Sequence, residues 1–344
     1  MAKRAKTPAR RSRASKVAKA APVEAKAPPI EMVTLLDFVR LAASRFMEAK
    51  LAFAHGTNDP VAEAAFLVCE TLNLHPDKFD TFAAARVTSL EARSILEVID
   101  RRISSRKPAA YLVNKIYMRG LPFYVDERVI VPRSFIGELL DSHFPGHDDG
   151  AGALIEDPRA VQSVLDLCTG SGCLAILASR NFPNARIDAV DISGDALDVA
   201  ARNVAGYGLQ DRVMLHRGDL FEPIGDKRYD LIISNPPYVD AEGMAELPLE
   251  CRAEPRLALE GGVDGLDVIS RIVSAARRHL MPDGGLLCEI GRCRPALEAA
   301  FPLTEFLWLE TEDSQGEVFW IRRRSLNFQM SLKNPAANPS KPPD

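Results

Sequence analysis

A short segment of the sequence, Asn235-Pro236-Pro237-Tyr238, holds the residue types needed to grip an NH₂ group. The two successive prolines offer no N–H donor and stiffen the backbone. The Asn235 side-chain oxygen and the Pro236 carbonyl remain as acceptors, and together they can hold both donors of an NH₂ group. Tyr238 adds a flat face against a planar amide or base. We therefore take Asn235, Pro236 and Tyr238 as candidate catalytic residues, and all four as candidate substrate contacts.

The chemistry that such a grip favours is methylation of the held nitrogen. A planar amide nitrogen is a poor nucleophile because its lone pair is delocalised. Fixing both N–H bonds aims the lone pair at the methyl group of a sulfonium donor, so that in-line transfer depends on positioning more than on acid–base catalysis. The sequence shows no Ser-His-Asp, Cys-His or metal-ligand pattern, and we expect no metal. An ordinary proline-rich turn is the alternative interpretation.

A glycine-rich loop upstream indicates a nucleoside cofactor. Gly170 and Gly172 follow a buried strand and let the backbone approach a ligand closely. Asp191 closes the next strand, where an acid can accept both ribose hydroxyls. The pattern Gly170-x-Gly172-x-x-Ala175 also satisfies the dinucleotide fingerprint, so the loop alone leaves a nicotinamide enzyme, a methyltransferase or a structural turn open. The Asn-Pro-Pro-Tyr segment favours the methyltransferase, and S-adenosylmethionine is the expected cofactor.

Further acidic and apolar residues follow the strand ends. Asp166 is expected to bond the methionyl end of the cofactor or to fix the loop. Asp219 and Leu220 are expected to flank the adenine, with a plain strand-end loop as the alternative. Asn235 is counted among the cofactor contacts as well. Glu289 is interpreted as structural.

These motifs require a scaffold that brings them together, and the surrounding pattern predicts one. Strand-like and helix-like segments alternate after residue 160, which indicates a mostly parallel, doubly wound Rossmann-like α/β domain. Such sheets bind ligands at the carboxyl ends of their strands, where both motifs begin. We expect the last two strands to pair antiparallel. The predicted strands are Val164–Leu167, Ile187–Val190, Val213–His216, Tyr229–Ile233, Gly285–Ile290, Phe306–Leu309 and Val318–Ile321.

The region before this domain has a helical pattern. A helix from Glu31 is expected to bury the face that includes Leu36, a second to start at Asp59-Pro60 with Val61 inward, and a third at a capping box of Thr88 with Glu91. A hairpin around Arg119-Gly120 is expected to link the two parts. The expected division is a disordered basic tail at 1–29, a helical substrate-recognition domain at 30–107, a hairpin linker at 108–145, the methyltransferase domain at 146–326 and a disordered tail at 327–344.

Charge and composition limit the partners. The 344 residues carry a net charge of −4, yet residues 1–28 hold nine Lys or Arg against Glu24 alone. A basic tail on an acidic body points to a polyanion such as ribosomal RNA, or to a merely solubilising arm. The basic group Arg101, Arg102, Arg106 and Lys107 is interpreted as a solvated helix end. No apolar run is long enough to span a membrane, and six cysteines without a CxxC pair indicate reduced thiols in the cytoplasm.

On these motifs the chain resembles the HemK-like protein-glutamine methyltransferases over roughly residues 31–325. The segment Pro132-Arg133-Ser134-Phe135-Ile136-Gly137-Glu138 is similar to the branch that methylates large-subunit ribosomal protein L-three, whereas the release-factor branch usually reads Pro-Arg-Pro-Asp-Thr-Glu. Phe135 differs from the proline expected there, and the basic N-terminal extension is not part of the family pattern.

The resemblance implies a class I methyltransferase fold in which the cofactor lies over Gly170–Gly172, with its ribose at Asp191. It further implies that Asn235 and the Pro236 carbonyl hold a glutamine amide beside Tyr238, with Arg133 among the substrate contacts. The helical domain is similar to one that helps to recognise the protein substrate.

Four alternatives remain at this point. With a release factor as substrate the reaction would be the same, but the sequence of residues Pro132–Glu138 disfavours this substrate. A DNA adenine methyltransferase needs a flipped base and a target-reading domain, and the acidic body lacks a basic patch for one. A nicotinamide oxidoreductase leaves the Asn-Pro-Pro-Tyr segment unexplained. A non-catalytic ribosome-assembly protein would retain only the fold. Assembly particles are further candidate partners, through the tail.

Overall fold

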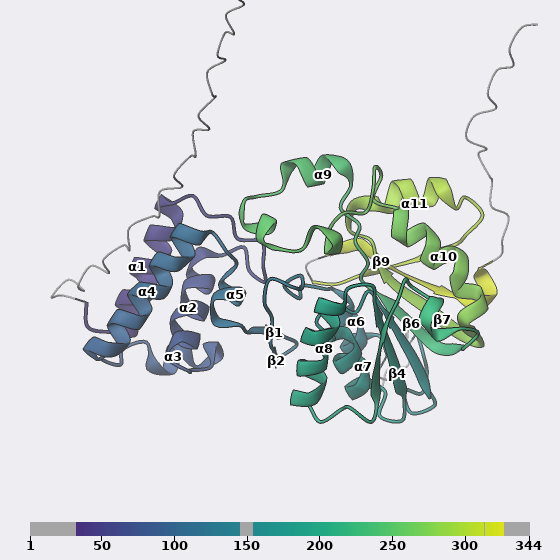
Figure 1. The fold of residues 1–344 in the computed structure, drawn as a ribbon, viewed down its shortest axis with the longest axis horizontal. Coiled ribbons are helices and arrows are strands. Elements are labelled where there is room, and N and C mark those ends of the chain that lie inside the picture. Colours follow the sequence, from purple (N-terminus) through teal and green to yellow (C-terminus); the bar gives the residue numbers. More distant parts are fainter. Residues whose placement is uncertain (1–31, 145–153, 313, 327–344) are drawn as a thin grey trace, which may run out of the picture.

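The computed structural model describes residues 32–144, 154–312 and 314–326 (Figure 1). Both predicted tails, 1–29 and 327–344, lie outside the described residues, as does most of the Pro-, Gly- and Asp-rich segment after residue 144. Among the described residues, no helix has the length and apolarity that crossing a membrane would require.

The N-terminal part of the described chain is helical, and its helices begin where local signals predict. Thr34 and Asp37 form a capping box, Asp59 caps a helix that has Pro60 in its first turn, and Thr88 forms a second capping box. These caps satisfy backbone N–H groups that a helix start leaves without partners. The helices are α1 (Leu35–Glu48), α2 (Pro60–Thr71), α3 (Phe79–Phe82), α4 (Ser89–Ser105) and α5 (Ala109–Val113).

Three predictions about these helices are wrong. Leu36 and Val61 were expected inward, yet 53% and 51% of their surfaces are exposed, and Phe38 lies in the core instead. Leu36 lies at the edge of the apolar stripe, about 100° around the helix from Leu35. Arg102 is fully buried rather than at a solvated helix end, because its guanidinium pairs with Glu63 at 2.8 Å.

A short hairpin and a further helix connect the helical part to the sheet domain (Figure 1). Strands β1 (Ile116–Met118) and β2 (Leu121–Phe123) pair antiparallel across Arg119 and Gly120, both of which have positive φ. The predicted hairpin is therefore confirmed. The same stretch also contains α5 and, after an irregular segment, α6 (Ile136–Ser142), neither of which the sequence indicated.

The C-terminal part contains a seven-stranded sheet with the order β5-β4-β3-β6-β7-β9-β8. β3 to β7 pair parallel, and β9 pairs antiparallel with both β7 and β8, which confirms the doubly wound fold and the antiparallel ending. The strands are β3 (Ser163–Leu167), β4 (Arg186–Asp191), β5 (Val213–Arg217), β6 (Tyr229–Ser234), β7 (Leu280–Glu289), β8 (Leu307–Glu310) and β9 (Gln315–Arg322).

Helices cover both faces of this sheet. Alternate strand residues point to opposite faces, so Val164 and Leu231 pack with α6, α7 and α8, while Leu165 and Ile232 pack with α10 and α11. The chain runs from β3 to β4 and β5 on one side of β3 and then crosses to β6 on its other side, and this reversal opens a crevice at the carboxyl ends of β3 and β6. The helices of this part, besides α6, are α7 (Cys173–Asn181), α8 (Gly194–Gly206), α9 (Ala241–Glu246), α10 (Asp267–His279) and α11 (Arg294–Ala300).

Candidate active site

The two sequence motifs start side by side at the carboxyl edge of the sheet. Leu167 at the end of β3 and Ser234 at the end of β6 are register partners in the parallel ladder. The Ser234 hydroxyl donates a hydrogen bond to the Leu167 carbonyl at 2.9 Å, which fixes the two strand ends together. The loop from Cys168 and the segment from Asn235 therefore begin at neighbouring points.

The glycine-rich loop is shaped by left-handed backbone conformations and by Asp191. Gly170 and Gly172 have φ of 56° and 78°, which glycine adopts without a steric penalty. The Asp191 carboxylate accepts the backbone N–H of Gly170 at 2.9 Å and that of Ser193 at 2.9 Å. Burial raises the pKa of Asp191, and these hydrogen bonds oppose the rise. Asp191 thus holds the loop in place from the end of β4.

A cavity of about 250 Å³ lies at this edge of the sheet and gathers six of the predicted site residues. They come from four different strand ends, which is the arrangement expected at the crevice of a doubly wound sheet. The six are Gly170, Asp191, Asp219, Leu220, Asn235 and Pro237.

Five other predicted site residues lie outside the lining of this cavity, and two of them support its walls. Asp166 is fully buried, and its carboxylate accepts the Thr169 hydroxyl at 2.5 Å and the Ala175 N–H at 3.1 Å. Burial raises the pKa of Asp166 to about 7. A Cβ at Gly172 would lie 3.2 Å from the Cβ of Ala200 in α8, so this position allows two helices to approach closely.

The other three are Pro236, Tyr238 and Arg133. Pro236 is buried at the end of β6. The Tyr238 hydroxyl donates to Glu289 at 3.0 Å, behind the acceptor segment. The Arg133 guanidinium donates two hydrogen bonds to Glu254, at 2.6 and 2.8 Å. Two of the predicted substrate residues, Tyr238 and Arg133, are thus hydrogen-bonded to buried carboxylates outside the cavity lining.

The remaining cavity wall comes from residues that the motifs did not indicate. Leu257 lies in the irregular segment after β6 and is 58% exposed. Arg271 of α10, which also lines the cavity, donates to Asp219 at 2.7 Å. Arg128 and Val129 contribute from the linker. No local pattern marks these residues, because each reaches the cavity only through long-range packing.

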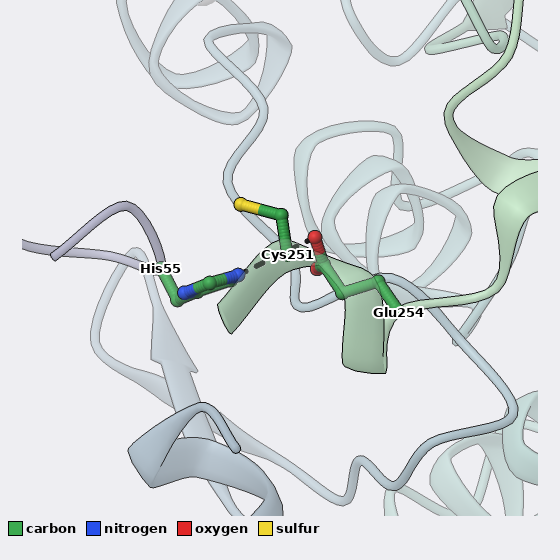
Figure 2. A group of neighbouring side chains, drawn as sticks. All are labelled: His55, Cys251 and Glu254. Atoms are coloured by element: carbon green, nitrogen blue, oxygen red, sulfur yellow. Dashed lines mark ion pairs between the residues drawn. The ribbon is translucent and has the colours of Figure 1, made fainter. Parts of the chain in front are cut away.

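Glu254 also lies in a cluster that joins the two parts of the chain. Figure 2 shows His55, from the loop after α1, beside Cys251 and Glu254 of the segment that follows α9. The His55 ring lies 3.4 Å from the Glu254 carboxylate, and both side chains are buried. Nearby, Arg106 pairs with Glu250 at 2.7 Å. The helical part is therefore connected by charged contacts to the segment that carries Leu257.

This cluster offers the ligand types of a metal ion, since one atom from each of the three residues lies within 4.8 Å of the others. The carboxylate of Glu254, however, already accepts from Arg133 twice and from the Val131 N–H at 2.8 Å. A divalent cation there would stand against the guanidinium and compete with it for the carboxylate. We interpret the cluster as an ion-pair contact between domains.

The cavity fits an S-adenosyl cofactor on three observations. A Cβ at Gly170 would meet nothing within 4 Å, so the loop backbone faces open space. Asp191 and Asp219 offer carboxylates at successive strand ends, and both line the cavity. Leu220 and Val268 supply apolar surface for a planar base.

Comparisons with known proteins agree with this fold. The model of the Methyltransferase small domain matches residues 145–251. The chain is 68% identical over 319 residues to a Bradyrhizobium diazoefficiens protein named ribosomal protein uL3 glutamine methyltransferase, covering 93% of this chain and all of that one. A Burkholderia pseudomallei protein of the same name is 52% identical over 305 residues, covering 87% and 97% of the two chains. One from Neisseria meningitidis serogroup B is 49% identical over 296 residues, covering 86% and 95%.

The protein is thus a methyltransferase with a class I Rossmann-like domain, and its methyl donor is S-adenosylmethionine. The predicted fold class, enzyme class and cofactor are confirmed. More narrowly, the chain belongs to the family of ribosomal protein uL3 glutamine methyltransferases. The predicted resemblance to the L-three branch is therefore confirmed as well. The roles of the individual site residues remain predictions.

Proposed function

We propose that the protein transfers a methyl group from S-adenosylmethionine to the side-chain amide nitrogen of a glutamine in ribosomal protein uL3. Relatives of 49–68% identity carry this activity in their names and align over most of both chains. Within this chain, one observation carries the proposal. Among the described residues, no hydrogen bond engages the side-chain amide of Asn235, which lines the cavity, or the carbonyl of Pro236, the second residue after β6.

Two free acceptors at a fixed spacing suit the two N–H donors of a primary amide. In the proposed reaction, the Asn235 side-chain oxygen and the Pro236 carbonyl accept these N–H groups and turn the nitrogen lone pair toward the cavity. The stiff Pro236-Pro237 backbone keeps the acceptors in place. Tyr238 provides a flat surface beside the amide. When bound, S-adenosylmethionine supplies an electrophilic methyl group, and the protein's share of the rate enhancement is positioning.

The cofactor contacts in this proposal follow the cavity lining. The Gly170 backbone faces the bound molecule, and Asp191 accepts the ribose hydroxyls. Asp219 and Leu220 flank the adenine, while Asn235 stands between cofactor and substrate. Asp166 and Gly172 contribute indirectly, by holding the loop and the approach of α7 to α8.

We also propose which parts of the chain contact its partners and in which compartment the protein acts. The helical domain at 30–107 is proposed to help recognise uL3, and residues 1–28, with nine Lys or Arg, to contact ribosomal RNA of an assembly particle. The cysteines of the described residues are free thiols, which suits a reducing compartment, and we place the reaction in the cytoplasm.

Deleting residues 1–28 should weaken particle binding more at low salt than at high salt. Equal binding with and without them at every salt concentration would contradict the RNA contact.

The amide grip is tested by Asn235→Ala, with Asn184→Ala as a matched control on an exposed loop away from the cavity. We expect Asn235→Ala to leave melting and cofactor affinity nearly unchanged and to slow methylation of purified uL3 about 10²–10³-fold, the usual loss for one preorganised polar contact. Asn235→Asp keeps an acceptor in place and should retain more activity than the alanine variant. Near-normal turnover by Asn235→Ala would contradict the proposed grip.

A further inference from the structure

Tyr238 is held more tightly than an aromatic contact at a binding surface requires. Gly291 approaches the ring so closely that a Cβ there would lie 2.6 Å from ring carbon Cε2. Gly261 approaches the main chain, where a Cβ would lie 2.7 Å from the Tyr238 Cα. The Cys293 thiol donates to the Tyr238 carbonyl at 3.2 Å. Both the backbone and one side of the ring are therefore confined by residues beyond β6.

The hydroxyl end of the ring is confined as well. Tyr238 donates to Oε1 of Glu289 at 3.0 Å. The other oxygen, Oε2, accepts the Ser134 hydroxyl at 2.6 Å and the Phe135 backbone N–H at 3.0 Å. Glu289 ends β7, whereas Ser134 and Phe135 precede α6 in the linker. One buried carboxylate thus joins the acceptor segment, the sheet and the linker.

We propose that Glu289 is a positioning residue that holds the Tyr238 ring, through its hydroxyl, at the angle at which the ring face receives the substrate amide. The Tyr238 hydroxyl is consequently committed to the protein, and the substrate meets the ring face alone. The inference rests on the proposed function for its catalytic consequence. The tether itself rests on the geometry of this chain.

Glu289 has an unusual set of neighbours for a buried carboxylate. Its donors are all neutral: two hydroxyls and one backbone N–H. The charged group that acts on it from β9 is Glu317, which opposes ionisation. Burial raises the pKa of Glu289 to about 7, although its three hydrogen bonds lower it. Proton uptake on Oε1 would turn that oxygen into a donor and reverse the hydrogen bond with Tyr238.

The first experiment needs no substrate. The six tyrosines of the chain are replaced by fluorotyrosine, and the ¹⁹F resonance of Tyr238 is identified by its loss in Tyr238→Phe. We expect this resonance to shift with a midpoint near pH 7 in the parent protein. It should stay constant over the same range in Glu289→Gln, which keeps the shape of the side chain. A Tyr238 resonance with the same chemical shift in both proteins at every pH would overturn the tether.

The second experiment measures the catalytic consequence with uL3 as substrate. Glu289→Gln should lower kcat about 10- to 100-fold, since a supporting hydrogen bond is lost and the ring is misplaced. Cofactor affinity should change less than twofold, because Glu289 does not line the cavity. The fall in kcat below about pH 7 should disappear in this variant. Ser134→Ala, which removes one of the three donors, should have a smaller effect of the same kind.

The matched control is a tyrosine at the start of β6, the strand that leads into the acceptor segment. Tyr229 starts β6, is buried, and donates its hydroxyl to the Asp188 carboxylate at 2.8 Å, far from the acceptor segment. Tyr229→Phe should leave kcat within about twofold, whereas Tyr238→Phe should lower it about tenfold. Equal effects of the two substitutions, or an unchanged kcat in Glu289→Gln, would overturn the positioning role. Failure of the parent protein to methylate uL3 would instead contradict the proposed function, and the ¹⁹F titration would still decide the tether.

Discussion

Glu254 and Glu289 are both buried where the linker meets the catalytic domain, yet they are surrounded by opposite kinds of partner. Glu254 faces the Arg133 guanidinium and His55. Burial alone would raise its pKa, but the neighbouring His55 ring and the hydrogen bonds from Arg133 lower it to about 2. Glu289 accepts only neutral donors, and burial raises its pKa to about 7.

These different partners suit Glu254 and Glu289 to different roles. With its pKa lowered to about 2, Glu254 is charged at neutral pH, so it can hold the helical part and the segment of Leu257 in one arrangement. A carboxylate without a cation changes its protonation near neutral pH, and Glu289 does so directly behind Tyr238. A buried acid whose pKa lies near neutral pH is typical of functional sites, whereas the Glu254 cluster connects the helical part to the rest of the chain.

Breaking the compensated pair should have the largest effect on stability. Arg133→Ala leaves the Glu254 carboxylate buried beside His55 without its guanidinium, which should cost about 3–5 kcal/mol of unfolding free energy. Denaturant unfolding of the purified protein measures this. A loss below about 1 kcal/mol would show that the pair is not compensating a buried charge.

Removing the Glu289 carboxylate, which has no cation beside it, should raise the stability of the protein, and the gain should depend on pH. The folded pKa of Glu289, about 7, lies above its ordinary value of 4.5, so the proton it binds stabilises the fold below pH 4.5. That stabilisation is lost as the pH rises through about 7, and it amounts to roughly 3 kcal/mol. Glu289→Gln should therefore gain stability relative to the parent protein between pH 5 and 8. Parallel stability curves for the two proteins would contradict the assignment.

A smaller loss of stability is expected when His55, the partner of Glu254 from the helical part, is removed. His55→Ala removes the contact from the helical domain but leaves both Arg133 hydrogen bonds on Glu254. We expect a loss of about 1–2 kcal/mol in thermal or denaturant unfolding. A loss as large as that of Arg133→Ala would mean that His55, rather than the guanidinium, balances the carboxylate.

The smallest effect on stability is expected for an exposed ion pair. Arg256 and Glu260 form an exposed i,i+4 pair at 2.7 Å, with 72% of the Arg256 side chain exposed. Arg256→Ala should leave the free energy of unfolding unchanged within the error of the measurement, because solvent screens such pairs. A loss near that of Arg133→Ala would indicate that burial is not what separates the two pairs.

The sequence indicates the parts of this site that are local. Asn235 and Gly170 follow strands whose apolar runs are plain, and parallel strands bring their carboxyl ends to one edge. The cap at Asp59 and the turn at Arg119-Gly120 are local for the same reason.

The long-range contacts could not be read in this way. His55 and Glu254 are far apart in the sequence, and only the packing of the helical part against the segment after α9 brings them to 3.4 Å. Arg133 was expected to contact the substrate from its place in a motif, which stays a prediction, and its guanidinium bonds Glu254, a partner that no spacing reveals. Glu289 was interpreted as structural because an isolated acid on a buried strand carries no sign of its partners.

The central claim is that this chain methylates a glutamine side chain of uL3. Purified uL3, incubated with the protein and S-adenosylmethionine, is digested and fragmented in a mass spectrometer to locate any added methyl group. The account predicts one methyl group on the side-chain amide of one glutamine, present with the parent protein and almost absent with Asn235→Ala. Unmodified uL3 alongside a methylated release factor in the same assay, or a methyl group on any other kind of residue, would contradict it.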